Sequence, residues 1–344
     1  MAKVTLQSIA DHVGVSRMTV SNAFSRPDQL SADLRAKILA AADQLGYVGP
    51  DPAARALARG RTGSVGLLLT DELSQAFEDA VATEFLSSVA GALTHEGLAL
   101  TLLTSGDVAG APSGYVPSRD VAMDGAIVYI CDPASPDIAW LERRGLPLVA
   151  VDRDPAADAP SVNVDDRGGA TAAAQHLVDL GHTRVAILTL RVEGVPKDNR
   201  PARERLVGWR APLEAAGIEP EVCAASYRRR GTVEQEARAL LDRPGRPTAI
   251  LCFSDAFAVA TIQVAHSLGL RVPEDLSVVG YDDSPLALAS QPQLTTVHQE
   301  VASKGHEAVR LLMGVMGTNP PEEPERVLLP TRLVIRDSTA PPPA

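Results

Sequence analysis

Residues Leu6–Phe24, LQSIADHVGVSRMTVSNAF, contain two short amphipathic runs that meet at a Val-Gly-Val turn. In the first run, apolar side chains recur at helical spacing as far as Val13. Gly14 can end that helix, because glycine tolerates the backbone angles of a C-cap. Ser16 can cap a second helix that ends at Phe24. The spacing predicts a helix-turn-helix, and the alternative is a helical hairpin of any small domain.

The next residues predict a third helix and then a short fourth one. Ser31 is a suitable N-cap for a helix over 32–45, whose apolar residues are spaced as a core stripe. Three helices in about 45 residues are typical of a DNA-reading headpiece. Asp51 can cap a helix over 53–59, which is too short to be stable alone in water. We therefore expect residues 49–61 to form a hinge helix, with a plain linker as the alternative.

The charge of the chain is divided unevenly along its length. The net charge is −11, but residues 1–60 hold seven Lys and Arg against five Asp and Glu. A weakly basic head therefore precedes an acidic body, and we expect DNA contacts only in the head. Cys131, Cys223 and Cys252 lie far apart in apolar runs, which favours reduced thiols in a cytoplasmic protein. The seven histidines show no metal-ligand spacing, and we expect no metal or cofactor.

From residue 64 onward, apolar strand-like runs alternate with amphipathic stretches that end at glycine. The runs are Val65–Leu69, Leu98–Leu103, Ala126–Ile130, Pro147–Val151, Val185–Leu190, Ala249–Phe253 and Ser277–Tyr281. This alternation predicts an α/β core of two doubly wound parallel-sheet subdomains. We assign the all-α headpiece to residues 1–48, one subdomain to 62–161 plus 296–325, the other to 162–295 plus 326–338, and a disordered tail to 339–344.

Polar residues follow the predicted strands, where ligands of such sheets bind. They include Asp132 after the third run, Asp152 after the fourth, Ser254 after the sixth and Asp282 after the seventh. Carboxylates and hydroxyls that face each other across a cleft suit a neutral polyhydroxy ligand. Each of them can equally cap the next helix, and Asp255 is interpreted as such a cap.

These motifs together resemble the lactose-repressor/galactose-repressor (LacI/GalR) family of bacterial transcription regulators. The resemblance covers residues 3–338, and its most specific parts are VTLQSIADHVGVSRMTVSNAF, PDPAARALARG, VDDRGGATAAAQHLVDLGHTRVAIL, RERLVGW, SDAFAVA, DLSVVGYDDSPLA and PQLTTVHQE. It implies a homodimer that binds a palindromic operator as a repressor. It also implies a core similar to periplasmic sugar-binding proteins, which holds a small effector, such as a sugar, in its cleft.

The resemblance also implies which headpiece residues contact DNA. The base-reading positions are Arg17, Met18 and Asn22, and arginine and asparagine suit guanine and adenine respectively. The phosphate-contacting positions are Thr5, Ser16, Thr19 and Ser21. In the hinge, Leu57 is the residue that wedges into the central base step, with Ala54 on the same face and Arg55 near the backbone.

The resemblance also implies which core residues contact the effector. The positions that match the family's effector contacts are Phe77, Asp132, Asp152, Arg203, Tyr227, Ser254 and Asp282. Arg203 corresponds to the arginine that binds effector hydroxyls or carboxylates, and Tyr227 to an aromatic ring that stacks on a sugar. Ser254 replaces an asparagine that sugar-binding members often carry. Trp209 is interpreted as a core residue.

Two other functions are alternatives to that of a regulator. A solute-binding protein of the periplasmic type needs a secretory signal, and the N-terminus MAKVTLQS has no apolar segment. An enzyme on this fold would carry a dinucleotide-binding, phosphate-binding or nucleophile-elbow motif, and the chain has none of these motifs. We also expect no membrane span, because the chain lacks a run of about 18 apolar residues.

Overall fold

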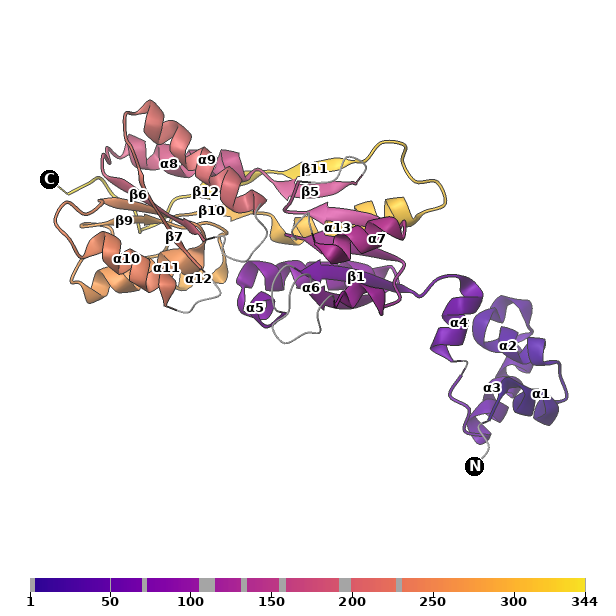
Figure 1. Cartoon of the computed structure of the whole chain (residues 1–344). Coiled ribbons are helices and arrows are strands. Elements are labelled where there is room, and N and C mark those ends of the chain that lie inside the picture. Colours follow the sequence, from indigo (N-terminus) through magenta and orange to yellow (C-terminus); the bar gives the residue numbers. More distant parts are fainter. Residues whose placement is uncertain are drawn as a thin grey trace. The chain divides into compact units, whose positions relative to one another are not determined.

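The structure is a computed structural model that describes residues 4–49, 51–69, 73–104, 115–130, 135–154, 159–191, 199–226 and 231–343. The chain forms two compact units, Met1–Gly63 and Ser64–Ala344, which are described separately below (Figure 1). We call Met1–Gly63 the headpiece unit and Ser64–Ala344 the core unit.

The headpiece unit is all-helical, as the sequence predicts. Its elements are α1 (Leu6–Val13), α2 (Arg17–Ser25), the 3₁₀ turn η1 (Pro27–Gln29), α3 (Ala32–Gln44) and α4 (Pro52–Arg59). The turn between α1 and α2 requires Gly14, whose φ of 79° lies in the left-handed region. The caps also form as expected, since the Ser16 side chain accepts from the Thr19 amide at 3.0 Å. Fully buried Ile9, Val20 and Ile38 join the first three helices.

The core unit has two lobes, each built on a parallel sheet. The first lobe orders its strands β11-β5-β4-β3-β1-β2. Its elements are β1 (Ser64–Leu69), α5 (Leu73–Glu78), α6 (Ala80–His95), β2 (Ala99–Thr104), η2 (Pro117–Arg119), β3 (Gly125–Tyr129), α7 (Pro136–Arg143), β4 (Leu148–Val151), β5 (Ser161–Val164), α13 (Val301–Met316) and β11 (Arg326–Leu329). Separate apolar clusters cover its two faces, one beneath α6 and α13 and the other beneath α7.

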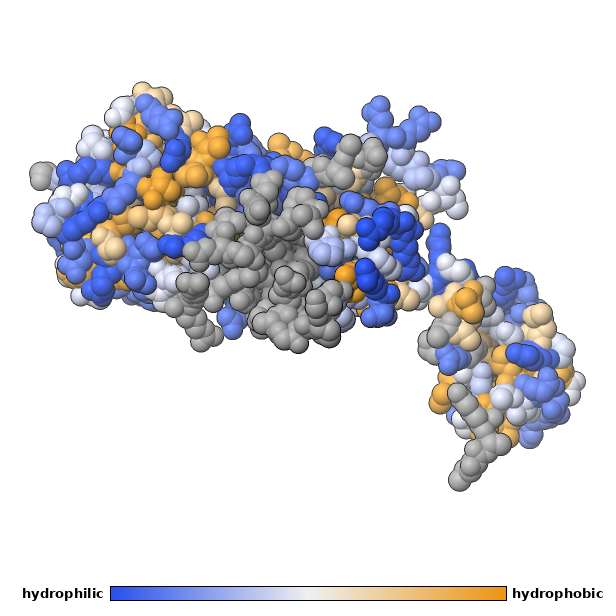
Figure 2. All heavy atoms as spheres, in the orientation of Figure 1, coloured by the Kyte–Doolittle hydropathy of each residue, from blue (hydrophilic) through white to orange (hydrophobic). Residues whose placement is uncertain are grey.

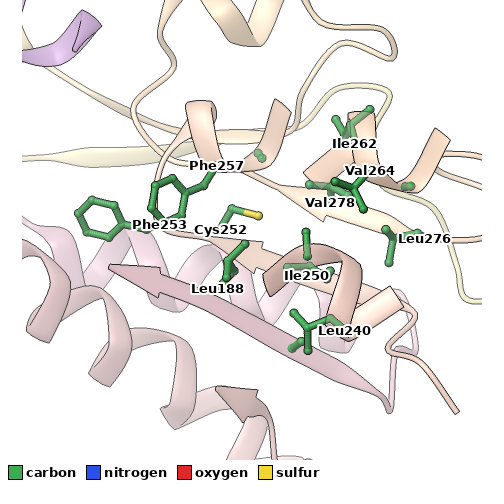
Figure 3. Packing of buried hydrophobic residues seen from close by; sticks show 14 of the residues in the cluster. Leu188, Leu240, Ile250, Cys252, Phe253, Phe257, Ile262, Val264, Leu276 and Val278 are labelled. Atoms are coloured by element: carbon green, nitrogen blue, oxygen red, sulfur yellow. The ribbon is translucent and has the colours of Figure 1, made fainter. Parts of the chain in front are cut away.

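The second lobe has a four-stranded parallel sheet of order β7-β6-β8-β9 and a two-stranded antiparallel pair, β10 and β12. Its elements are α8 (Asp166–Asp179), β6 (Val185–Leu190), α9 (Arg200–Ala215), β7 (Glu221–Ala225), α10 (Thr232–Leu241), β8 (Ala249–Cys252), α11 (Asp255–Ser267), β9 (Ser277–Val279), α12 (Pro285–Ala289), β10 (Thr296–Gln299) and β12 (Thr331–Val334). Figure 3 shows the cluster beneath α10 and α11, in which Ile250 and Val278 of the sheet lie among residues of these helices. A second cluster lies beneath α8 and α9 on the opposite face. Helices on both faces of both sheets confirm the predicted doubly wound α/β architecture.

The chain crosses between the lobes at other points than those predicted. Residues 161–164 and 326–329 belong to the first sheet, because β5 pairs with β4 and β11 pairs with β5, all in parallel. The prediction of 162–295 and 326–338 for the second lobe was wrong for these strands. Residues 296–299 lie in the second lobe instead of the first, since bridges at Val279–Thr295 and Asp282–His298 continue its sheet. The sequence of a strand beside a point where the chain passes between the lobes does not indicate which of the two sheets the strand joins.

The C-terminal tail is ordered over its described residues, which corrects the prediction of disorder from 339. Ser338 is fully buried and its hydroxyl donates to the Val278 carbonyl at 2.6 Å. The Ala340 amide donates to the Ser277 hydroxyl at 3.0 Å, and the His182 ring lies 2.9 Å from the Ala340 carbonyl. The tail is therefore held by polar groups beside β9, and proline-rich composition alone did not indicate this.

Candidate DNA-reading surface and effector cavity

The start of α2 presents the predicted base-reading residues to solvent. Arg17 is exposed and the Met18 side chain is 70% exposed. Asn22 is half-buried, and its side-chain amide donates to the Gln29 carbonyl oxygen at 3.1 Å. Gln29, which sequence reasoning missed, therefore holds one side of the Asn22 amide. Polar residues cover most of the visible headpiece surface, and apolar colour also shows where α4 lies (Figure 2).

The predicted phosphate-contacting residues all lie at or near helix starts, where they already serve the fold. Thr5 caps α1 by accepting from the Ser8 amide at 3.3 Å. Ser16 caps α2, and its hydroxyl lies 2.8 Å from that of Thr19. Ser21 is half-buried one turn further along α2. Helix starts present free backbone amides, which suit phosphate oxygens.

The short helix α4, which the sequence predicts to be a hinge, carries an apolar side chain in an exposed position. Leu57 is 86% exposed, and Ala54 and Arg55 are exposed as well. The Ala54 amide donates to the Asp51 carboxylate at 3.4 Å, so the predicted cap at Asp51 is present. A helix of eight residues that buries so little depends on an external partner for its stability.

The core unit contains a cavity of about 340 Å³ lined by both lobes. The first lobe contributes apolar residues and two acids, namely Leu69, Val81, Tyr129, Ile130, Glu78 and Asp79. The second lobe contributes Leu190, Phe253 and Leu286 with polar Arg191, Asn199, Ser226, Ser254, Asp282 and Ser284. Burial raises the pKa of Tyr129 well above its ordinary value, and Asp152 adds to the shift. The cavity is thus mainly apolar, with a few polar groups that converge on it, which is typical of small-molecule sites.

The structure brings only part of the predicted effector set to this cavity. Ser254 and Asp282 line it, whereas Phe77, Asp152 and Arg203 do not. Phe77 is 58% exposed. Asp132 and Tyr227 lie outside the described residues. Ser254 also caps α11 by accepting from the Phe257 amide at 3.3 Å, so the cap assigned to Asp255 was placed one residue late.

Arg205 contacts two residues that line the cavity, Phe253 and Asp282, although neither Arg205 nor Arg203 is itself a lining residue. The Arg203 guanidinium is partly exposed and pairs with Asp154 at 2.7 Å. Arg205 is 4% exposed, donates to Asp166 at 2.9 Å and to the Phe253 carbonyl at 2.6 Å, and lies 3.4 Å from Asp282. Because Gly208 has no side chain, α9 can approach the Arg167 carbonyl of α8 closely, which brings this face of α9 inward.

The charges around Arg205 are strongly coupled by burial. Burial lowers the pKa of Arg205, but the adjacent carboxylates of Asp166 and Asp282 raise it overall. Burial raises the pKa of Asp282 well above its ordinary value, and Arg205 acts against this shift. The guanidinium also lies over the ring of Tyr281, 3.6 Å from its centroid. These contacts fix Asp282 at the cavity wall.

Asp152, which was predicted to face the effector, is instead paired inside the first lobe. Its Oδ2 accepts from the Lys304 ammonium at 2.6 Å, and both side chains are buried. Lys304 also donates to Gln299 Oε1 at 3.0 Å, and Gln299 Nε2 donates to Asp282 Oδ1 at 2.8 Å. Sequence reasoning missed Lys304 and Gln299, although a lysine on the apolar face of α13 was a visible signal.

Two further features of the described residues bear on what the cavity can hold. No cluster of His, Cys, Asp and Glu able to hold a metal ion occurs among them. Cys252 is fully buried, and burial raises the pKa of its thiol to about 12, so it is a packing residue. Within the described ranges, no helix is long and apolar enough to cross a membrane.

A helix-turn-helix headpiece joined to a ligand-binding α/β core defines a class of ligand-responsive DNA-binding proteins.

Comparisons with known proteins agree with this class. Residues 5–49 match the profile of bacterial regulatory proteins of the lacI family, and residues 174–339 match that of periplasmic binding protein-like domains. The transcriptional regulator IpsA of Corynebacterium glutamicum is 36% identical over 90% of both chains. A CelR–cellobiose complex superposes with a TM-score of 0.70 at 30% identity, covering 98% of this chain and 100% of that one. The Lac repressor dimer bound to operator and the anti-inducer ONPF gives 0.82 at 25% identity, covering 98% and 99%.

The chain therefore belongs to the LacI family of bacterial regulatory proteins. It is a DNA-binding transcriptional regulator and not an enzyme.

Proposed function

We propose that this regulator is a repressor that binds a palindromic operator, and that a neutral sugar in the cavity between the lobes controls its operator affinity. The observation that carries the proposal is that both lobes line one cavity, so a ligand there can favour one arrangement of the lobes over another. Two copies of the chain form the functional unit, since one headpiece reads only half of a palindrome.

The charge of the cavity favours a ligand without a phosphate. Glu78, Asp79 and Asp282 line it, whereas Arg191, the one cation among the described lining residues, pairs with Glu236 at 2.8 Å. Asp282 Oδ2 has no partner among the described residues, so it is available to accept from a hydroxyl. The apolar wall around Tyr129 and Phe253 suits the C–H face of a sugar ring.

In the headpiece, Arg17, Met18 and Asn22 read bases and Leu57 enters the minor groove. Phosphates are contacted by the hydroxyls of Thr5, Ser16, Thr19 and Ser21. Ala54 and Arg55 also contact the DNA at the minor groove, beside Leu57. One solved relative is a Lac repressor dimer bound to operator, which supports operator binding by this chain. The protein acts in the cytoplasm, on the nucleoid.

A thermal-shift screen of the full chain tests the ligand class. Cellobiose, glucose and ribose are compared with glucose 6-phosphate and ribose 5-phosphate, because a ligand that binds only the folded state raises the melting temperature. We expect at least one neutral sugar to stabilise the wild type and to have little effect on Asp282→Asn. A larger shift with the phosphates would contradict the proposed class. Arg203→Ala, at a partly exposed position that does not line the cavity, is the matched control and should respond like the wild type.

A further inference from the structure

Lys304 is a charged residue in a place that an apolar one could fill. It is 1% exposed and lies on the face of α13 that also buries Val301, Ala308 and Leu312. Burial of an ion pair removes both charges from water, so such a pair often adds no more stability than apolar residues of similar size. The stability of the first lobe therefore does not account for Lys304 and its partner Asp152.

The second contact of Lys304 fixes the orientation of a side-chain amide. Its ammonium has only donors, so the group that faces it at 3.0 Å is the carbonyl oxygen of Gln299. The amide nitrogen of Gln299 consequently points the other way and donates to Asp282 Oδ1 at 2.8 Å. An ionised Asp282 can only accept a hydrogen bond and favours the same orientation, so Lys304 and Asp282 fix the amide from both ends.

This Lys304–Gln299–Asp282 chain connects the lobes at the cavity wall. Lys304 belongs to α13 of the first lobe, Gln299 ends β10, and Asp282 follows β9 of the second lobe. Asp282 Oδ1 is occupied by Gln299, with Arg205 at 3.4 Å. The oxygen left for the cavity is Oδ2, so the position of the acceptor depends on an amide that the other lobe orients.

We propose that Lys304 is a positioning residue of the effector site. It orients Gln299, which in turn holds Asp282 with one oxygen directed to the cavity, and it thereby ties effector recognition to the first lobe. This inference rests on the proposed function of the cavity and adds a residue that touches no effector.

Two variants separate positioning from stability. Lys304→Met alone leaves the Asp152 carboxylate buried without its partner, so it should lower stability and is informative only if the protein folds. Asp152→Asn combined with Lys304→Met removes both charges and should recover most of the melting temperature. Arg310→Met on the exposed side of α13 is the control, since its partners Glu307 and Glu325 are themselves partly exposed.

The first measurement needs no effector. The full chain is labelled with ¹⁵N-glutamine, and the Gln299 side-chain signal is identified by its loss in Gln299→Met. We expect hydrogen exchange of this amide to be at least ten-fold faster in the double variant than in the wild type or in Arg310→Met. Unchanged exchange in a folded double variant would overturn the proposal, because Lys304 would then not orient Gln299.

The second measurement tests whether the orientation of Gln299 affects effector binding. Cellobiose, glucose and ribose are titrated into the wild type and both variants, and at least ten-fold weaker binding is expected in the double variant alone. A double variant with recovered stability and wild-type affinity would leave Lys304 a merely structural role. If none of the sugars binds the wild type, the proposed sugar function fails, while the exchange measurement still decides the role of Lys304.

Discussion

The headpiece unit and the core unit present the residues that we propose to be functional in opposite ways. In the headpiece, Met18 and Leu57 stand in solvent, and their removal leaves no buried group without a partner. In the core, Arg205 and Lys304 are buried and bonded to carboxylates of several elements. A DNA groove is a large external partner that exposed residues can enter, whereas a small effector needs buried polar groups already held in place.

The difference has a direct consequence for mutagenesis. Substitutions of exposed headpiece side chains that cap no helix, such as Met18 and Leu57, should change DNA affinity and leave stability nearly unchanged. Substitutions in the core network should change stability and effector response together, because the same hydrogen bonds serve both. Variants that change DNA affinity without changing stability, or that change stability and effector response together, test this difference between the two units.

The largest expected effect is a loss of stability in the core. Arg205→Met leaves Asp166 and Asp282 buried without their cation, which should lower the free energy of unfolding by about 3–5 kcal/mol. Arg203→Met removes only a partly exposed pair with Asp154 and should cost about 1 kcal/mol or less. Urea unfolding of the core transition measures both, and equal losses would refute the placement of Arg205.

A smaller effect is expected at the hinge. Leu57→Ala removes the exposed side chain that we place in the base step, and operator affinity should fall by about 2–3 kcal/mol. Fluorescence anisotropy with an operator selected from random DNA measures this loss. The melting temperature and the response to sugars should stay at wild-type values. Undiminished operator affinity would exclude the wedge.

The core should also show a pH dependence centred on Asp255. Burial raises the pKa of this carboxyl to about 6, while hydrogen bonds from Thr296 and Ser284 act against the shift. The folded state therefore binds the proton more tightly than the unfolded state, and this contribution to stability is lost as pH rises from about 4 to about 6. Relative to Asp255→Asn, the wild type should lose about 2–3 kcal/mol over that range. Parallel pH profiles of the two proteins would show that Asp255 does not titrate in this way.

The smallest effects concern single base contacts. Arg17→Ala and Asn22→Ala should each cost about 1–3 kcal/mol and relax the preference at one base pair. Thr5→Ala should weaken binding to all sequences about equally, because phosphates carry no sequence information. Affinities for a set of singly substituted operators distinguish these outcomes. A uniform loss in Asn22→Ala would reassign Asn22 to the backbone.

Local signals in the sequence predicted the headpiece well. The turn at Gly14, the cap at Ser16 and the third helix depend on residues near each other in the chain, so spacing was sufficient. The alternation of strands and helices likewise predicted two doubly wound lobes. The pairing of β5 and β11 was not predictable, since a short strand beside a crossing can extend either sheet.

Part of the cavity and its surroundings could not be predicted from the sequence for a related reason. Ser254 and Asp282 follow strands and were found by that rule. The contact of Arg205 with Asp282 depends on which face of α9 turns inward. Arg205 and buried Trp209 are four residues apart and share a face, whereas Arg203 does not, and this spacing was the signal that could have chosen between the arginines. The pairing of Lys304 with Asp152 joins residues 152 positions apart, which only the fold brings together.

The most direct test of the account is the effect of a neutral sugar on operator binding by the full chain. Anisotropy of the selected operator is followed while the sugar that most stabilises the protein is added, in the wild type and in Asp282→Asn. We predict that the sugar changes wild-type operator affinity by about ten-fold or more and leaves that of Asp282→Asn unchanged. An unaffected wild type, or a full response in Asp282→Asn, would contradict the claim that this cavity controls the headpiece.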